Sequence, residues 1–290
     1  MAISISEAYI DTFENNVRHL AQQSQAKLRG TVQERSVQSE SHNWERLGTL
    51  TASQKASARV ATPTQDATWS RRVSVPSTYH IGTSAEQEDP VQMLVDPNSN
   101  LTRAIAAGMQ RQIDDVIIAA ATGTALDGQG VNQAFPAGQV IGNGTASITF
   151  DTVTQVQELF MQNEIDPSVP KCFVVGPTQV RKLMQLTQQT SADYVDAKAL
   201  QTLNSTGIVP NWMGFTWIVS TRLLVPAAGE ISCLAYTMDA LGLQVNKDIS
   251  TRVAEDPSLS FAWRLYAHMT LGAVRVEDEH IVHVHLLDSI

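Results

Sequence analysis

Cysteine is scarce in this 290-residue chain, and its scarcity excludes a fold built on disulfides. The two cysteines, Cys172 and Cys233, each lie within a short apolar run. Such runs are typical of buried strands, so we expect two buried free thiols that are not joined to each other. This cysteine usage fits a reducing compartment such as the cytosol.

Charged residues are also few, at 17% of the chain against about a quarter in ordinary globular proteins. A low share of charge suggests that more surface than usual is hidden, for instance between subunits. A surface rich in Ser, Thr and Gln would give the same figure. The hydrophobic share of 43% is ordinary, and the length allows one large domain or two modest ones.

Positive charge is missing from most of the chain, whose net charge is −9. Residues 1–80 carry nine Lys and Arg and seven Asp and Glu, whereas residues 81–290 carry eleven and twenty-two. An acidic body argues against tight, sequence-reading nucleic-acid binding, which needs clustered cations. No run approaches 18 apolar residues, and residues 1–7 lack the cationic and apolar regions of a signal peptide. We therefore expect no membrane span and no secretory signal.

The short motifs of common enzymes are absent as well, including the Gly-x-Ser-x-Gly elbow, His-Glu-x-x-His and the Walker lysine. Residues 127–132 (Asp-Gly-Gln-Gly-Val-Asn) resemble part of a phosphate loop but follow a helix, so they predict a plain turn. Asp114 and Asp115 are neighbours on a helix and do not converge on one point, which predicts a solvated helix face. We expect no catalytic residue and no cofactor.

Three histidines near the C-terminus are the best candidates for chemistry. His283 and His285 are two apart on a predicted strand, so they share a face and could both reach one metal ion. His280 would point to the opposite face, which spoils a three-ligand site unless the strand bulges. A half-exposed strand is the favoured interpretation, and a metal-dependent enzyme is the less favoured one.

Two segments have apolar patterns but too little core of their own. Residues 6–24 predict an amphipathic helix with Tyr9, Phe13 and Val17 on its apolar face. Residues 45–83 predict a long two-stranded arm with a turn-rich tip at residues 62–68. An isolated two-stranded ribbon is marginal in water, so we expect the arm to rest on a neighbour.

The second half of this arm alternates cleanly between side-chain types. We expect Val73, Val75, Tyr79 and Ile81 on one face and the polar residues between them on the other. The cluster of Trp69, Arg71 and Arg72 could stack a base or grip a phosphate. An inter-subunit contact is at least as plausible for this cluster, because Trp and Arg are favoured interface residues. We take as candidate contact residues Tyr9, Phe13, Val17, Trp69, Arg71, Arg72, Val73 and Tyr79.

Residues 98–122 predict the most secure element, a long helix that stops near Gly123. Its apolar stripe consists of Leu101, Ile105, Met109, Ile113, Ile117 and Ala120. A short helix from Asp89-Pro90 precedes it. Downstream we expect short strands near Val140 and Ile148, a helix capped by Asp151, a strand at 172–175, a helix from Pro177, a polar surface excursion at 188–207, strands at 215–219, 231–235 and 243–245, and long antiparallel strands at 261–287. The fold class is α+β with projecting extensions.

This order of elements resembles the Hong Kong-type capsid fold of tailed double-stranded DNA bacteriophages, and the resemblance covers nearly the whole chain. The local sequence at residues 89–123 and at 171–178 (Lys-Cys-Phe-Val-Val-Gly-Pro-Thr) also resembles that of major capsid proteins of that group. The resemblance implies five parts, listed in chain order: an N-terminal arm at 1–44, an extended loop at 45–83, a peripheral domain at 84–150 with a spine helix at 98–122, an axial domain at 151–270, and C-terminal strands at 271–290 that return to the peripheral domain.

The resemblance further implies a virion protein, assembled in the host cytoplasm into pentamers and hexamers of an icosahedral shell. Packaged double-stranded DNA would be enclosed without sequence-specific binding, and scaffolding, portal and cement proteins are the other expected partners. Some members cross-link lysine to asparagine, but Lys55 is the only lysine in the loop and we predict no cross-link. An encapsulin-like bacterial compartment shell, filled with a cargo enzyme, is the alternative with the same fold.

Overall fold

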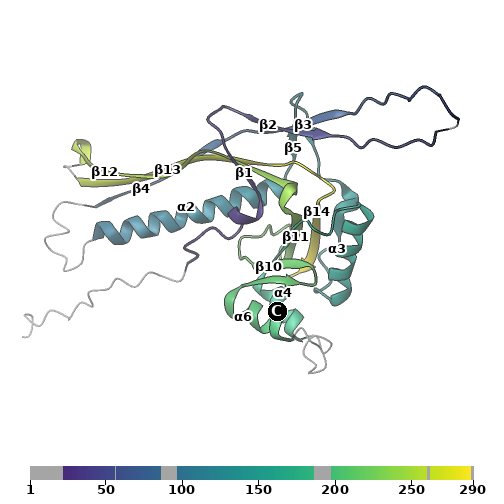
Figure 1. Ribbon diagram of the computed structural model, residues 1–290. Coiled ribbons are helices and arrows are strands. Elements are labelled where there is room, and N and C mark those ends of the chain that lie inside the picture. The colour runs from purple at the N-terminus through teal and green to yellow at the C-terminus, as the bar shows by residue number, and fades with distance from the viewer. Residues whose placement is uncertain (1–21, 56, 86–96, 186–196, 260–261, 289–290) are drawn as a thin grey trace, which may run out of the picture. The chain divides into compact units, whose positions relative to one another are not determined.

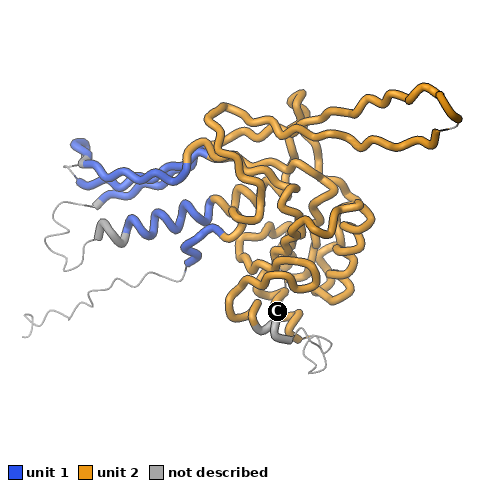
Figure 2. The backbone as a smooth tube through the Cα atoms, in the orientation of Figure 1, with its two compact units in different colours: residues 1–26, 78–112, 248–270 blue, residues 27–77, 113–247, 271–290 orange. Residues whose placement is uncertain are grey.

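The computed structural model describes residues 22–55, 57–85, 97–185, 197–259 and 262–288. The chain divides into two compact units, each assembled from segments far apart in the sequence (Figure 2). Unit 1 comprises residues 1–26, 78–112 and 248–270, and unit 2 comprises the remaining three segments. Among the described residues, no helix combines the length and apolar character needed to cross a membrane.

Three sheets and four described α-helices make up the fold, which confirms the α+β class (Figure 1). The first sheet has the order β1-β12-β13-β4, the second β7-β14-β11-β8-β10-β9, and the third β2-β3-β5-β6. The strands are β1 Gln33–Ser36, β2 His42–Leu47, β3 Trp69–Ser74, β4 Ser77–Ala85, β5 Ala125–Asp127, β6 Asn132–Gln133, β7 Val140–Ile141, β8 Lys171–Val175, β9 Ile208–Trp212, β10 Phe215–Val219, β11 Glu230–Thr237, β12 Leu241–Asp256, β13 Ala262–Arg275 and β14 Ile281–Leu287.

The long helix predicted at 98–122 is α2, Pro97–Thr122. Its predicted apolar stripe is buried at Ile105, Met109, Ile113 and Ile117, because residues three and four apart stack on one helix face. After the helix, the Gly123 N–H donates to the Ala119 carbonyl at 2.8 Å. A Cβ on Gly123 would lie 2.7 Å from that carbonyl oxygen, so the helix end needs glycine.

The core of unit 2 lies on the six-stranded sheet. The predicted strands at 172–175, 215–219 and 231–235 are β8, β10 and β11, and all three are almost fully buried. Phe173 and Trp217 stack at 4.6 Å between ring centroids, with Phe215 edge-on to Phe173 at 5.6 Å. Helix α3 (Phe150–Gln162) contributes Val153, Val156 and Phe160 to this core, and α4 (Pro177–Gln185) contributes Val180 and Leu183.

Several local predictions were wrong. Thr149, not Asp151, caps α3: its Oγ1 accepts the Thr152 N–H, and the Thr152 hydroxyl accepts the Thr149 N–H. Asp151 lies in the first turn instead and accepts a bond from Gln155. No strand forms at Ile148, residues 22–24 are not helical, and residues 197–206 of the expected polar excursion form helix α6 (Ala197–Thr206).

The arm does not continue as one strand through residue 81. Pro76 has no N–H to donate, so β3 ends at Ser74 and β4 begins at Ser77 in another sheet. The predicted apolar face is therefore wrong here, because Arg72 and Ser74 of β3 are buried and Val75, just after the strand, is exposed. The short helix predicted from Asp89-Pro90 lies outside the described residues.

Candidate subunit-contact site

The base of the extended loop is an antiparallel ribbon of β2 and β3. Its register places Leu47 opposite Trp69 and Glu45 opposite Arg71. Successive side chains point to opposite faces of a strand, so these four share one face. We call this the outer face of the ribbon, and the face carrying Arg72 and Ser74 the inner face.

The outer face is exposed and carries both an apolar pair and a cation. Trp69 is 71% exposed and Leu47 is 57% exposed. The Arg71 guanidinium meets a Glu45 carboxylate oxygen at 3.2 Å, and both side chains are about half exposed. A shallow pocket of about 420 Å³ lies here, lined by Glu45, Trp69, Ser70, Arg71, Asp127, Gly128 and Gln129.

The β5–β6 turn fixes the position of Arg71. A Cβ on Gly128 would lie 2.3 Å from Arg71 Cγ, so glycine lets the arginine stem lie directly on the turn. Asp127 holds the turn rigid by accepting the N–H groups of Gln129 and Val131, both at 2.8 Å. These two hydrogen bonds lower the pKa of the Asp127 carboxyl below its usual value, and the bond from Val131 has the larger effect. This is the plain turn predicted for residues 127–132.

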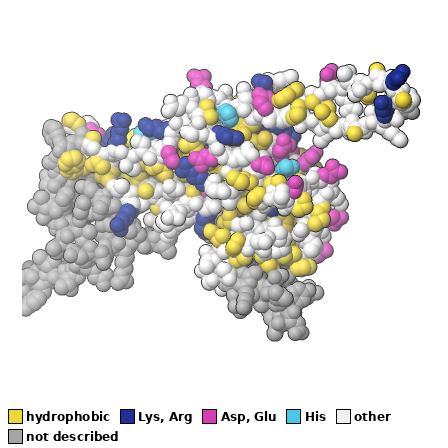
Figure 3. Space-filling view, in the orientation of Figure 1, with side chains coloured by type: hydrophobic (Ala, Val, Ile, Leu, Met, Phe, Trp, Pro, Cys, Tyr) yellow, Lys and Arg dark blue, Asp and Glu magenta, His cyan; other side chains and the backbone are white. Residues whose placement is uncertain are grey.

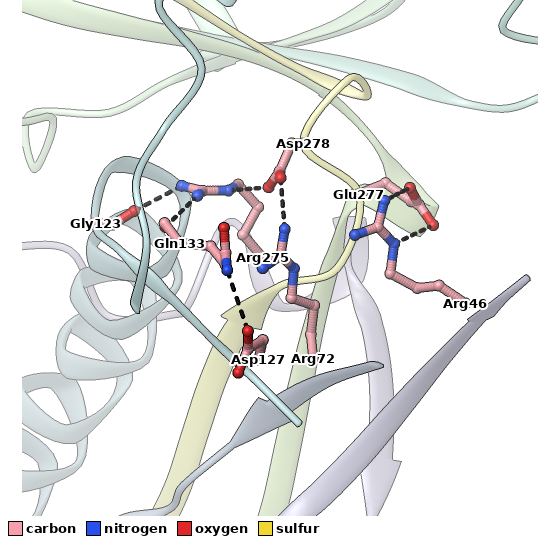
Figure 4. A network of polar contacts seen from close by, with 8 residues as sticks. All are labelled: Arg46, Arg72, Gly123, Asp127, Gln133, Arg275, Glu277 and Asp278. Atoms are coloured by element: carbon pink, nitrogen blue, oxygen red, sulfur yellow. Dashed lines mark hydrogen bonds and ion pairs between the residues drawn. The ribbon is translucent and has the colours of Figure 1, made fainter. Parts of the chain in front are cut away.

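The inner face leads into a buried network of ion pairs (Figure 4). Asp278 accepts Arg72 Nη2 at 2.6 Å on one oxygen and Arg275 Nε at 2.5 Å on the other. Arg275 is fully buried and also donates to the carbonyls of Gly123 and Gln133, at 2.6 and 2.9 Å. One carboxylate thus ties β3 to the end of β13, while Arg275 ties β13 to the C-terminus of α2 and to β6.

Two further contacts fix the ribbon from the same side. Arg46 forms a bidentate pair with Glu277 at 2.9 and 3.1 Å (Figure 4). Trp44 Nε1 donates to Ser74 Oγ at 3.1 Å, and that hydroxyl donates to Gln244 at 2.8 Å. A Cβ on Gly242 would lie 2.5 Å from the Trp44 ring, so Trp44 packs directly on the β12 backbone.

The loop beyond the ribbon, residues 48–68, has no core. Its described residues are exposed except Gly48 and Ala67, which are half-buried. The Gly48 N–H donates to the Thr68 carbonyl, and the Thr51 N–H to Gln65. Figure 3 shows hydrophobic side chains along this loop and Lys and Arg side chains near its end. An exposed loop with apolar side chains and so few internal bonds is typical of a surface that another chain covers.

The candidate contact residues thus fall into four groups. Trp69 and Arg71 lie together on the outer face, and Val73 is half-buried on the same strand. Tyr79 is half-buried on β4, which belongs to another sheet. Arg72 is only 6% exposed, and its guanidinium forms an ion pair with Asp278 of the same chain. Tyr9, Phe13 and Val17 lie outside the described residues.

The C-terminal histidines lie on or beside β14. His283 is buried against Phe135, with 3.7 Å between the ring centroids, and Arg275 lies 5.0 Å from the same phenyl ring. The His283 Nε2–H donates to the Ala121 carbonyl at 3.1 Å. Burial is the main reason why the pKa of His283 falls to about 4; the nearby His285 and Arg275 act in the same direction, and the hydrogen bond to Ala121 opposes them. Within the described ranges, no three His, Cys, Asp or Glu side chains gather as metal ligands.

Asp114 is not on a solvated face, contrary to the prediction. It is fully buried, and its carboxylate accepts the backbone N–H groups of Lys27 and Leu28 at 3.0 to 3.1 Å. The Lys27 ammonium donates to the Val219 carbonyl at 2.7 Å. Asp115 forms an ion pair with Arg222 nearer the surface. Asp114 therefore ties the chain at residues 27–28 to helix α2.

The two thiols are buried and free, as predicted. Burial raises the pKa of Cys172 to about 11 and that of Cys233 to about 12. Both groups therefore stay protonated at neutral pH, which makes them poor nucleophiles.

The sequence profile of the phage capsid protein family matches residues 5–288. The chain belongs to this family. Membership implies a structural role, as a component of a capsid. A search of curated protein sequences found no significant match.

Solved phage capsid structures share the fold over almost the full chain. The capsid of cyanophage P-SCSP1u matches with a TM-score of 0.72 at 15% identity, covering 100% of this chain and 96% of that one. The capsid of Ralstonia phage GP4 matches at 0.75 and 8% identity, covering 97% and 96%. The capsid of a native GTA particle matches at 0.71 and 13% identity, covering 98% and 97%. At these identities the likeness shows the fold, and it confirms the Hong Kong-type prediction.

The sequence did not predict the residues that hold the inner face of the ribbon in place. Arg275 and Asp278 lie three apart at the end of a predicted strand, but their partner Arg72 is about 200 residues away in the chain. Gly128 belonged to a turn that was predicted, and nothing in the sequence links it to Arg71. The alternation of β3 was the available signal, because Arg71 and Arg72 must point to opposite faces.

Proposed function

We propose that this chain is the structural subunit of an icosahedral phage head and assembles with copies of itself into pentamers and hexamers. The observation that carries the proposal is the capsid-family match over residues 5–288. The exposed outer face and the coreless loop support it, because both need a covering partner. A repeated contact between different surfaces of identical subunits closes rings and then shells.

We keep the five-part division as a proposal except at two places, the strands β12 and β13 and the C-terminal segment. It has an N-terminal arm at 1–44, an extended loop at 45–83, and a spine helix at 98–122 within the peripheral domain 84–150. The axial domain at 151–270 is centred on the six-stranded sheet. Because β12 and β13 pair in the sheet of β4, we propose that these two strands act with the peripheral part. In the same way β14, in the C-terminal segment 271–290, joins the axial sheet beside β11.

The shell is proposed to enclose double-stranded DNA without gripping it, since a net charge of −9 opposes tight adhesion to phosphate. Scaffolding, portal and cement proteins are the proposed further partners, and assembly in the host cytoplasm fits two free thiols. The role is structural, with no catalytic residue and no cofactor. The proposed subunit contacts use Trp69, Arg71, Val73 and Tyr79 together with Tyr9, Phe13 and Val17 of the arm.

The test is the mass and shape of the purified chain, measured by light scattering and negative-stain microscopy. Closed shells or rings with five- and six-fold symmetry are the expected result. The contents of particles from infected cells distinguish a phage head, which holds DNA, from a bacterial compartment, which holds a protein cargo. A monomer or dimer that persists at high concentration with scaffold supplied would overturn the proposal.

A further inference from the structure

The outer face of the ribbon has the composition of a binding hot spot. Trp69 and Leu47 present an apolar surface beside the Arg71 guanidinium, and Trp69 and Arg71 line a pocket of about 420 Å³. Exposed Trp and Arg at the centre of a contact carry much of the binding energy in protein interfaces. The 71% exposure of Trp69 also shows that no other described part of its own chain covers it.

This face is already held in one conformation. Gly128 supports the stem of Arg71, and the Asp127 hydrogen bonds fix the turn beneath it. On the opposite side of the strand, Arg72 is held by Asp278. Since these contacts fix the β3 backbone and the stem of Arg71, less conformational freedom is lost there when a partner binds. Glu45 meets Arg71 through a single half-exposed contact at 3.2 Å, too weak to exclude a second carboxylate.

The charge of the loop region identifies the kind of partner. Residues 45–72 carry five Lys and Arg against two Asp and Glu, while the rest of the chain carries fifteen against twenty-seven. The loop and ribbon are therefore basic and the body is acidic. Opposite charge steers two copies into a contact between different surfaces.

One surface of the acidic body combines the matching features. Residues 151–170 contain four acidic residues, all exposed, and no Lys or Arg. They include helix α3, on which Met161 is 67% exposed. Glu158 lies three residues before Met161 and so shares its helix face. Figure 3 shows Asp and Glu side chains over this part of unit 2. An apolar side chain beside an anion on α3 complements an apolar side chain beside a cation on the ribbon.

Resting on the proposed function, we propose that the outer face of the ribbon docks on the α3 face of a second copy of this chain. In this contact the Arg71 guanidinium binds the Glu158 carboxylate, and the Trp69 ring packs on the Met161 thioether, a favourable aromatic–sulfur contact. The contact joins two different surfaces, so it repeats from subunit to subunit until a ring closes.

A charge swap tests this pairing. Arg71→Glu and Glu158→Arg are made singly and together, and Trp69→Ala tests the apolar half. Each single change should lower the assembled fraction by about tenfold, the equivalent of one lost charge-assisted pair. The double variant should recover to within about threefold of the unmodified chain. Arg181→Glu on α4 and Glu279→Arg are matched controls that change the charge equally, and they should assemble normally.

Chemical denaturation of the unassembled chains checks that each variant folds. If Arg71→Glu assembles as well as the unmodified chain, or if the double variant is as defective as the singles, the proposed pairing is wrong while the capsid function stands. If the unmodified chain forms no shells, the proposed function fails and the pairing falls with it.

Discussion

The two faces of the β2–β3 ribbon place neighbouring arginines under opposite conditions. Arg72 on the inner face is 6% exposed and shares a carboxylate with the fully buried Arg275. Arg71 on the outer face is about half exposed, lies on a glycine turn and meets Glu45 through one contact. Exposed ion pairs such as Arg71–Glu45 contribute little to stability. Breaking a buried pair leaves a buried charge without a partner and is strongly destabilising.

Position on a strand thus decides whether an arginine stabilises its own chain or remains available to another. The inner face uses charge to hold the ribbon on the body of unit 2. The outer face leaves charge and apolar surface available to another chain. Inner-face changes should therefore act on the free energy of unfolding, and outer-face changes on assembly.

The largest stability effect should come from Asp278→Ala. The change leaves Arg72 and Arg275 without their carboxylate, so the free energy of unfolding should fall by about 3–5 kcal/mol. Urea denaturation measures it. Glu279→Ala, at the exposed neighbouring position, and Glu45→Gln on the outer face should each change it by less than about 1 kcal/mol. Equal losses of unfolding free energy in Asp278→Ala and Glu45→Gln would contradict the claim that only the inner face stabilises the fold.

Acid should weaken the same region through His283. Its pKa is about 4 in the folded chain and about 6.5 when unfolded, so the unfolded chain binds the proton more tightly. The stabilising contribution is complete above pH 6.5 and is lost as pH falls towards 4, by on the order of 3 kcal/mol. His283→Gln, which cannot titrate, should flatten this part of the stability profile. An unchanged slope in His283→Gln would contradict the assignment.

Asp114→Ala should have an intermediate effect. It leaves the buried N–H groups of Lys27 and Leu28 without their acceptor, which costs about 2 kcal/mol. The matched change Asp115→Ala removes a partly exposed pair with Arg222 and should cost less than about 1 kcal/mol. Thermal and urea unfolding measured side by side would show whether the order is as expected or reversed.

The smallest stability effect should follow from the largest change. Replacing residues 49–67 by a short Gly-Ser turn removes exposed chain but keeps β2 and β3, so the free energy of unfolding should move by less than about 1 kcal/mol. Assembly into shells should be lost, as seen by light scattering and microscopy. A shortened chain that still closes into shells would show that the loop is not a subunit contact.

Local patterns predicted much of the fold because local physics determines it. The stripe Ile105, Met109, Ile113 and Ile117 follows from helical periodicity, and the strands β8, β10 and β11 follow from short apolar runs. The order of elements was enough to indicate the capsid fold. The cap of α3 was misplaced by two residues, because Thr149 and Asp151 are both good cap residues and only the bonding pattern separates them.

The site could be predicted only on its exposed side. Trp69 and Arg71 stood out as interface residue types, but the burial of Asp114 depends on backbone groups 86 and 87 positions away in the chain. Arg72 is buried because Asp278 lies behind it, and Val75 is exposed because Pro76 ends the strand. No periodicity in a single sequence contains such long-range pairings.

The two buried thiols make the chain suited to chemical labelling. With pKa values of about 11 and 12, Cys172 and Cys233 are almost entirely protonated at pH 7.5, and maleimides react with thiolates. A cysteine introduced in the loop, for example by Ser57→Cys, would be the one reactive thiol of each subunit. A fluorophore or ligand could then be attached there without removing any native residue from the core, and its response on assembly would report when the loop becomes covered.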